Sequence, residues 1–135
     1  MTYHVKNYTS DELRINKEIL KEVIKLSNKA YLDPKNKANN NYKISKNSST
    51  LLHIIFKQNR FDDNIGILSL LYDEDNLIGF AGAYKHTNDI LICLVRAFIL
   101  KQYRAKGLFG KIILPQQIEY AKANNFKVAW LTFNE

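Results

Sequence analysis

The chain has 135 residues, which is the size of one domain with a single hydrophobic core. Its 46% apolar and 12% aromatic content excludes a disordered tail, and five Gly with two Pro exclude collagen-like and low-complexity chains. The longest apolar run, Ile90 to Val95, is far shorter than the roughly 20 residues of a membrane-spanning helix. The N-terminus has no apolar segment behind a basic start, so no secretory signal is predicted. We expect residues 1–135 to form one domain that remains in the cytoplasm, away from membranes.

The net charge of +7 comes from 20 Lys and Arg residues against 13 Asp and Glu residues. A basic balance is compatible with nucleic-acid binding, but most of the basic residues are dispersed lysines that are not interleaved with aromatic side chains. Solvated surface lysines are therefore the favoured interpretation. The exception is one segment without acidic residues, which predicts a local anion-attracting patch and contains Lys101, Arg104, Lys106 and Lys111.

The single cysteine, Cys93, cannot form an internal disulfide, and its apolar neighbours predict a small core residue. Since no His flanks it, we do not expect it to carry an acyl group during a reaction. The histidines, His4, His53 and His86, have no Cys, His or carboxylate beside them at the spacing of metal ligands. We therefore expect no metal site.

The first elements are a strand and a helix. Residues 3–8 alternate weakly and predict a short strand. Thr9 to Glu12 has the composition of a capping box, which predicts the start of a helix. Apolar residues then recur mostly every three or four positions, which indicates one amphipathic helix, straight or bent, over residues 10–30. Asp33-Pro34 ends it, because the residue before a proline avoids helical backbone angles.

A polar, Asn-rich segment from Lys35 to Ser49 predicts a long surface loop. Loops of this length often lie at binding sites, although a loop without a function is an equally open interpretation. Ser48 to Thr50 can cap a second helix over residues 51–58, whose apolar residues are too continuous to be clearly amphipathic.

Three β-like runs follow. Residues 65–72 and 77–85 flank a polar turn and predict a hairpin. Gly79 and Gly82 weaken the pairing of its second strand, so they indicate a bulge or a close approach to the backbone. Residues 90–100 are apolar on both faces, as expected of a central strand.

The segment after this strand carries the most chemical information. Residues 102–111 form a basic, Gly-bearing turn that leads into a helical pattern ending near Asn124. The first turn of a helix presents unpaired N–H groups and about half a positive charge, so a strand, this turn and a helix together predict an anion cradle. Residues 126–133 form another apolar strand, which completes a right-handed βαβ unit.

This order of elements resembles the GCN5-related N-acetyltransferase (GNAT) family. The pyrophosphate loop of that family follows Q/R-x-x-G-x-G/A. Arg104 fills the Q/R position and Gly107 the first glycine position. Ala105 stands where the family often has Gly, Phe109 stands where it prefers Gly or Ala, and Gly110 comes one place late.

The resemblance covers roughly residues 65–135 and implies an α/β fold, a GNAT-like mixed central sheet flanked by helices with a βαβ cofactor-binding unit. It implies that acetyl-CoA is the co-substrate, with its pantetheine arm in a splay between the fourth and fifth strands, at about Ala97 to Leu100 and Val128 to Leu131. The backbone N–H groups of Phe98 to Leu100 would then hold the thioester carbonyl and stabilise the oxyanion. The cofactor-binding residues implied are Phe98, Ile99, Leu100, Arg104, Ala105, Lys106, Gly107, Leu108, Phe109 and Gly110.

The function implied is transfer of an acetyl group from acetyl-CoA to a primary amine by direct attack. A small amine, a peptide N-terminus and a lysine side chain all stay open as acceptors. The general base is unassigned, since core or surface roles are favoured for Tyr84, His86, Glu119 and Tyr120. Two alternatives stay open: a catalytically inactive domain that binds CoA or acyl-CoA and, less favoured, a basic nucleic-acid-binding module.

The family usually continues beyond the fifth strand with a helix and two more strands. Only Asn134 and Glu135 follow that strand here. The resemblance therefore implies either a fragment of a longer protein or a homo-oligomer that buries the edge of this strand and the face around Trp130.

Overall fold

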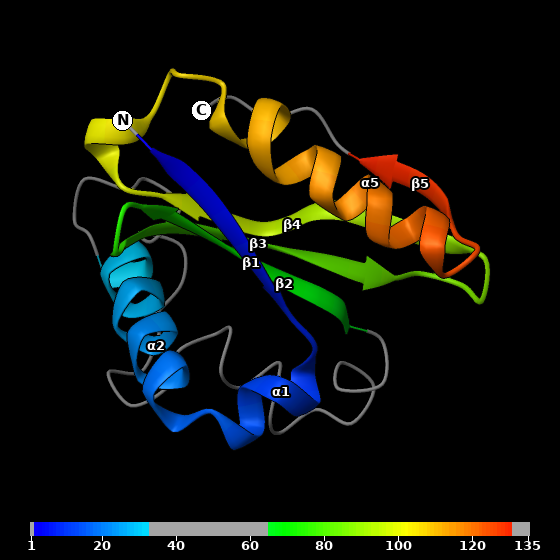
Figure 1. Ribbon diagram of the computed structural model, residues 1–135, viewed down its shortest axis with the longest axis horizontal. Helices are drawn as coiled ribbons and strands as arrows, with labels where there is room; N and C mark the ends of the chain where they lie inside the picture. The colour runs from blue at the N-terminus through cyan, green and yellow to red at the C-terminus, as the bar shows by residue number, and fades with distance from the viewer. Residues whose placement is uncertain (1, 33–64, 131–135) are drawn as a thin grey trace.

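The computed structural model describes residues 2–32 and 65–130 of the chain. Within them, five strands form one sheet whose order follows the chain (Figure 1). Neighbouring strands from β1 to β4 are antiparallel, and β5 lies parallel to β4. The strands are β1 (Tyr3–Tyr8), β2 (Ile65–Asp73), β3 (Asn76–Lys85), β4 (Ile90–Ile99) and β5 (Lys127–Trp130).

Helices cover both faces of this sheet, with α1 and α2 on one side and α5 on the other (Figure 1). A π-helical turn, η3, runs directly into α5, so β4, these helical segments and β5 make a βαβ unit. The helical elements are α1 (Ser10–Ile15), α2 (Lys17–Leu32), the 3-10 turn η2 (Lys101–Tyr103), η3 (Phe109–Ile113) and α5 (Leu114–Ala123).

The side chains of β2 show how the core is divided between the two faces. Leu68 and Leu70 pack against α1 and α2, whereas Ile67 and Leu71 face α5 and η3. This is the alternation expected of a strand that is covered on both sides. The predicted α/β architecture, a mixed sheet flanked by helices, is therefore confirmed. The helical residues of the two layers include Leu13, Val23 and Leu26 on one face and Phe109, Ile113 and Ala121 on the other.

The predicted hairpin and the third β-run are also confirmed, since β2 pairs with β3 and β3 with β4. Gly79 is a point of close approach, because a Cβ at this position would lie 2.7 Å from the carbonyl oxygen of Phe98. Gly82 lies between two register shifts in the ladder between β3 and β4. Both glycines thus have the roles that their positions in a strand indicate.

The prediction of one helix over residues 10–30 is wrong, because Asn16 divides it into α1 and α2. The capping box is present: Glu12 N–H donates to the Thr9 hydroxyl, and the Thr9 N–H donates to the Glu12 carboxylate. Asn16 has non-helical angles (φ −105°, ψ 84°), and its Oδ1 accepts a hydrogen bond from the N–H of Ile19 at 3.3 Å. Asn side chains compete with helical hydrogen bonds in this way. The break leaves Ile15 85% exposed, although its spacing had placed it on the apolar stripe.

Several sequence predictions fall outside the described residues: the end of the helix at Asp33-Pro34, the loop over residues 35–49, the helix over residues 51–58, and the last strand beyond Trp130. Pairing through the edge of β5 accordingly stays a prediction. In the described part of the chain, no helix is both long and apolar enough to cross a membrane. Nor do three or more His, Cys, Asp or Glu residues gather there in a group fit to hold a metal ion.

Candidate cofactor site

β4 and β5 lie side by side over only part of β4. Their parallel pairing runs from Ile90↔Lys127 to Cys93↔Trp130. From Leu94 onward, β4 has no strand partner on this side among the described residues. The observed pairing thus covers the first half of β4, and the splay that the sequence resemblance implied at Ala97 to Leu100 lies beyond the last described residue of β5 and stays a prediction.

The position of the splay on β5 needs a correction. Val128 was expected to mark its start, but Val128 to Trp130 are paired with Leu91 to Cys93 in the first half of β4. The expectation failed because it took the second half of β4 to lie opposite these residues. Leu131, the last residue of the expected splay, lies outside the described part of the chain.

β4 is also irregular along its edge with β3. Between the pairs Tyr84↔Ile92 and Phe80↔Phe98, β3 advances by four residues and β4 by six, so β4 carries two extra residues. Leu94 lies in this stretch with φ 58°, in the left-handed region that residues with a Cβ rarely adopt. A bulge bends the strand that contains it. This bulge lies directly after the last observed pair of β4 with β5.

At the end of β4, neighbouring peptide groups point in opposite directions. The N–H of Leu100 donates a hydrogen bond of 2.9 Å to the carbonyl of Ile78 and so faces β3. Because residues of an antiparallel ladder alternate, the N–H and C=O of Ile99 face away from β3, toward the other edge of β4. The expectation that the Leu100 N–H holds a thioester carbonyl is therefore wrong, and Ile99 presents its backbone on the required side.

Two side-chain hydrogen bonds hold the basic turn against the end of the sheet. Nε of Arg104 donates to the carbonyl of Ile99 at 3.1 Å, and its guanidinium carbon lies 5.8 Å from the centre of the Phe98 ring. The hydroxyl of Tyr103 donates to Oδ2 of Asp73 at 2.7 Å, a bond that raises the pKa of Tyr103 above its usual value. Arg104 thus fixes the turn with one of its five N–H donors.

Two residues of the turn have left-handed backbone angles. Ala105 has φ 63° and Gly107 has φ 69°. For a residue with a Cβ this conformation costs about 1–2 kcal/mol, which Ala105 bears and Gly107 avoids. A Cβ on Gly107 would also lie 3.3 Å from Cε of Lys111, which covers it. The backbone conformation therefore favours glycine in the position shared with the family.

The departure from the family pattern at Phe109 does not obstruct this turn. Its side chain is buried and packs against Leu71 and Ile78. Gly110 is exposed, and no atom lies within 4 Å of the point where its Cβ would stand. The large side chain thus points into the core, and the outer side of the first helical turn stays uncovered at Gly110.

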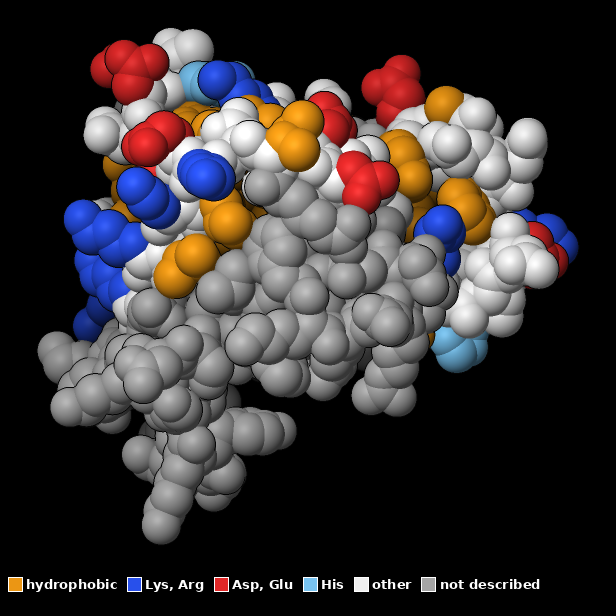
Figure 2. Space-filling model, turned by 90° about the horizontal axis from the view of Figure 1, so that it is seen from below, with side chains coloured by type: hydrophobic (Ala, Val, Ile, Leu, Met, Phe, Trp, Pro, Cys, Tyr) orange, Lys and Arg blue, Asp and Glu red, His pale blue; other side chains and the backbone are white. Residues whose placement is uncertain are grey.

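The helical run after the turn begins at Leu108, and its first hydrogen bond, 2.9 Å long, joins the N–H of Lys111 to the carbonyl of Gly107. The four basic residues of the predicted patch, Lys101, Arg104, Lys106 and Lys111, are all exposed around this helix start. Figure 2, which views the molecule from below, shows Lys and Arg side chains at the left end, where α2 lies in Figure 1. Positive charge and the partial charge of the helix N-terminus therefore occur together.

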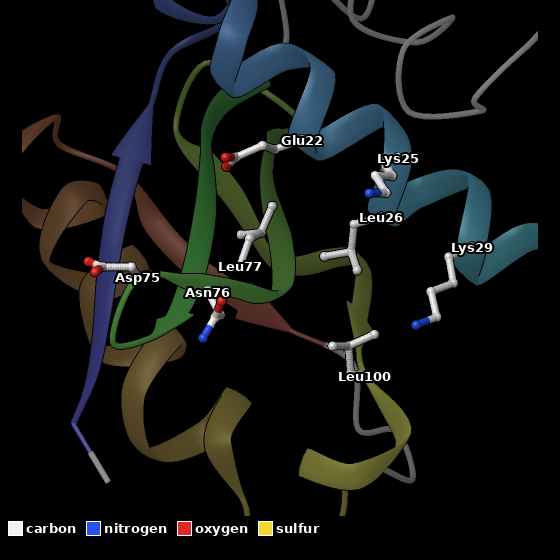
Figure 3. Close-up of a pocket in the computed structure, with 8 residues that line it drawn as sticks. All are labelled: Glu22, Lys25, Leu26, Lys29, Asp75, Asn76, Leu77 and Leu100. Atoms are coloured by element: carbon white, nitrogen blue, oxygen red, sulfur yellow. The ribbon is translucent and has the colours of Figure 1, made fainter.

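A recess of about 310 Å³ lies on the α2 side of the same end of β4 (Figure 3). Its volume is close to the lower end of the range for small-molecule sites. One wall comes from α2, another from the turn between β2 and β3, and a third from Leu100, which follows β4. It is lined by the apolar residues Leu26, Leu77 and Leu100, the charged residues Glu22, Lys25, Lys29 and Asp75, and Asn76.

A buried phenol lies beside this recess. Tyr72 is opposite Leu77 in the ladder between β2 and β3, and it is 5% exposed. Its hydroxyl has no hydrogen-bond partner in the described part of the chain. Burial, with a contribution from the negative charge of Glu22, raises the pKa of Tyr72 to about 12. The hydroxyl is therefore a neutral donor at physiological pH.

The remaining titratable groups do not identify a general base. Cys93 is 1% exposed, which confirms the prediction of a core residue, and burial raises the pKa of its thiol to about 11. Tyr120 is half-buried, and burial raises its pKa as well. His86 and Glu119 are exposed. The general base stays unassigned.

Sequence reasoning missed Gln117, a completely buried polar residue that contacts the bulge at Leu94. A signal for its burial existed, because Gln117 lies four residues after Ile113 and four before Ala121, both of which are buried. It also missed the contact between Tyr103 and Asp73, for which a spacing of 30 residues offers no local signal.

No family model matches this chain, and no curated protein matches it. Solved structures do. A GNAT family acetyltransferase from Staphylococcus aureus subsp. aureus is 23% identical, with a TM-score of 0.57 over 100% of this chain and 89% of that chain. The PaiA N-acetyltransferase from Thermoplasma acidophilum, in complex with coenzyme A, is 14% identical, with a TM-score of 0.55 over 98% and 80% of the two chains. AAC(6′)-Iy, in complex with the bisubstrate analogue CoA-S-monomethyl-acetylneamine, is 15% identical, with a TM-score of 0.58 over 100% and 82%.

At this level of identity, the similarity concerns the path of the chain rather than its chemistry. The matches extend over nearly the whole chain, so they include the N-terminal helices as well as the βαβ unit that carries the sequence motif. The chain therefore has the fold of the GCN5-related N-acetyltransferases, as the sequence resemblance predicted.

Proposed function

We propose that this chain is an N-acetyltransferase that moves the acetyl group of acetyl-CoA to a primary amine by direct attack. The observation that carries the proposal is the junction at the end of β4. There the strand has passed its last observed pair with β5, turns the peptide group of Ile99 away from β3, and continues through a basic turn into the helix start at Leu108. A pantetheine arm is strand-like and needs an open strand edge, whereas a pyrophosphate needs cations and a helix N-terminus. This junction offers both.

In this proposal the phosphates lie over the helix start, near Leu108 and Gly110, with Lys101 and Lys106 as exposed cations beside them. The N–H of Ile99 donates to a carbonyl of the pantetheine or thioester. The amine nitrogen attacks the thioester carbon, and the carbonyl oxygen becomes an oxyanion. The C–S bond then breaks, the carbonyl re-forms, and the proton lost by the nitrogen passes through water to the departing CoA thiolate. The protein contributes chiefly by positioning the reactants and stabilising the oxyanion. Two similar structures contain CoA or a CoA analogue, which supports the choice of cofactor.

The recess beside Leu100 is our candidate for the acceptor side. It adjoins the last residue of the strand along which the pantetheine would lie. Glu22 and Asp75 are matched there by Lys25 and Lys29, and Leu26 and Leu77 offer apolar contact. A small molecule with an amino group is the acceptor class that we favour, and the mixed charge of the recess does not select its net charge.

The first test compares acetyl-CoA, CoA and ATP by thermal shift and calorimetry. We expect acetyl-CoA and CoA to stabilise the chain, with ATP weaker because it lacks the pantetheine arm. Turnover is then measured as release of free CoA thiol with a panel of amines. Equal stabilisation by ATP and CoA, or no stabilisation by either, would contradict the proposal.

A CoA-binding domain without catalysis is the second candidate. It is favoured by one observation: among the described titratable residues near the end of β4, none is placed as a general base beside Ile99. Binding of CoA without thiol release for any amine in the panel would select this alternative. Binding of DNA or RNA that weakens steeply with salt, with no stabilisation by acetyl-CoA, would instead select a nucleic-acid-binding module.

A further inference from the structure

Gln117 of α5 is completely buried although its side chain is polar. Its Oε1 accepts a hydrogen bond of 2.9 Å from the N–H of Leu94. Its Nε2 donates to the carbonyl of Ala81 at 3.0 Å and to the hydroxyl of Ser69 at 3.2 Å. The orientation of the amide follows from these partners, because a backbone N–H can only donate and a backbone carbonyl can only accept. One side chain thus connects α5 with β2, β3 and β4.

The two backbone partners of Gln117 belong to residues that have no partner in the irregular ladder between β3 and β4. The pairing of β3 with β4 passes from Phe80↔Phe98 to Gly82↔Val95 and omits Ala81. On β4, Leu94 is omitted between the pairs of Ile92 and Val95, and it lies beyond the last pair with β5. A buried backbone group without a partner destabilises the fold. Because a primary amide has the donor and the acceptor of a peptide group, Gln117 replaces the missing rung of the ladder.

The helix is shaped to place this amide. Buried residues recur at every fourth position, at Phe109, Ile113, Gln117 and Ala121. In a regular α-helix of 3.6 residues per turn, a four-residue spacing drifts by about 40° at each step. The π-helical turn over Phe109–Ile113 holds more residues per turn, so a four-residue step there drifts in the opposite sense and offsets the drift of α5. The turn that begins at the phosphate loop therefore also directs Gln117 at the bulge.

The hydrogen bonds continue on the same face of the sheet to the edge strand β1. The hydroxyl of Ser69 donates to Oδ1 of Asn7 on β1 at 2.6 Å, and Ser69 is completely buried. The series of hydrogen bonds from Leu94 to Asn7 is thus complete, because each buried donor in it has an acceptor. Such fully satisfied networks make the surrounding backbone rigid.

We propose that Gln117 is a positioning residue for CoA. It keeps the bulge at Leu94 in shape and thereby fixes the course of the second half of β4, so that the pantetheine arm can lie along the edge of Ile99 that faces away from β3. It acts through Leu94 and does not touch the cofactor. This inference rests on the proposed function, since the cofactor that it positions is the one proposed above.

The test compares CoA with 3′-phosphoadenosine 5′-diphosphate, the part of CoA that has all three phosphates and no pantetheine. Gln117→Met keeps a side chain of similar length and removes both hydrogen-bonding groups. We expect its affinity for CoA, measured by calorimetry, to fall by about tenfold. Its affinity for the phosphate fragment should stay unchanged, because the basic turn is intact. The matched control is Ile113→Val, which reduces packing on the same helix face one turn earlier and should leave the ratio of the two affinities at the wild-type value.

A second variant covers the case in which Gln117→Met does not fold. In Gln117→Glu the neutral carboxyl can still accept from Leu94 and donate to Ala81, whereas the carboxylate can only accept. We expect the ratio of CoA to fragment affinity to approach the wild-type value at low pH and to fall as the carboxyl ionises. A ratio equal to that of wild type in the folded Met variant, or a ratio independent of pH in the Glu variant, would overturn the positioning role. A wild-type chain that binds neither ligand would instead overturn the proposed function.

Discussion

The hydroxyl of Tyr103 donates a hydrogen bond of 2.7 Å to Oδ2 of Asp73 and joins the basic turn after β4 to the end of β2. The ring of Tyr103 also lies edge-on to Tyr3 of β1, with 6.3 Å between the ring centres. Nζ of Lys106 lies 5.5 Å from the centre of the Tyr103 ring. The side chain of Tyr103 thus joins the turn to two strands and contacts Lys106, one of the cations of the turn. The geometry of the candidate phosphate site therefore depends on Tyr103.

Tyr103→Phe tests this dependence. The variant keeps the ring contacts with Tyr3 and Lys106 and loses the bond to Asp73, so the turn should become less ordered before the cofactor binds. We expect CoA affinity to fall by roughly threefold to tenfold, as measured by calorimetry. Tyr8→Phe makes the same chemical change on β1 and should leave CoA affinity unchanged. Equal affinities for wild type and Tyr103→Phe would show that the turn is held in place without this bond.

The same bond makes a prediction about pH. The pKa of Tyr103 is raised above its ordinary value of 10.0 chiefly because the protonated hydroxyl donates to Asp73. A group whose pKa is raised by folding stabilises the protein fully below its unfolded pKa, and this stabilisation is lost as pH rises through the folded pKa. Urea unfolding of wild type should therefore show a loss of stability above pH 10 that is smaller in Tyr103→Phe. A difference between the two proteins that is independent of pH would contradict this assignment.

The buried thiol of Cys93 should be unreactive in the native protein. Burial raises its pKa from 9.0 to about 11, which lowers the thiolate fraction about a hundredfold at any pH below 9. Alkylation by iodoacetamide near neutral pH should accordingly be at least that much slower in the native protein than in urea. Since this pKa is raised by folding, the associated stabilisation is present below pH 9 and is lost between pH 9 and about 11. Native alkylation as fast as that in urea would show that β4 opens readily.

The elements that were predictable from sequence are those with a strong local pattern. The capping box at Thr9, the hairpin on both sides of the polar turn, and the βαβ unit with Gly107 at its helix start each depend on neighbouring residues. Each was predicted because the signal lies within a few positions of the sequence. These signals are the two-residue periodicity of a strand, the 3.6-residue periodicity of a helix, a helix cap, and a glycine where φ is positive.

The features that escaped prediction depend on residues far apart in the chain. The bulge at Leu94 needs Gln117, 23 positions later, to satisfy its N–H, and the register of β5 depends on pairing with Leu91 across the βαβ unit. The break at Asn16 is local, but the apolar spacing on both sides of it is compatible with a continuous helix. Periodicity identifies the face that a residue occupies, and it does not show where one hydrogen-bonding pattern ends and the next begins.

The basic residues around the helix start should act on the phosphates alone. Lys101, Lys106 and Lys111 are exposed, so each contact should contribute about 1 kcal/mol or less. Replacing them one at a time with Gln should weaken CoA binding and make it less sensitive to salt, as calorimetry at several salt concentrations can show. Affinity for acetyl-pantetheine, which has no phosphate, should not change. Equal losses for both ligands would mean that these lysines support the fold rather than the phosphates.

The two left-handed residues of the turn make opposite predictions. Gly107→Ala introduces a Cβ at φ 69° and 3.3 Å from Cε of Lys111, so the free energy of unfolding should fall by about 1 kcal/mol. Ala105→Gly removes a Cβ at φ 63° and should raise it by roughly 0.5–1 kcal/mol. Gly110→Ala serves as the control for helix propensity, because its Cβ would meet no atom within 4 Å, and it should stabilise the helix by about 0.5–1 kcal/mol. Urea unfolding measures all three. If Gly107→Ala were as stable as Gly110→Ala, the left-handed conformation at Gly107 would not be required by the turn, and its place in the pyrophosphate loop would lose its structural basis.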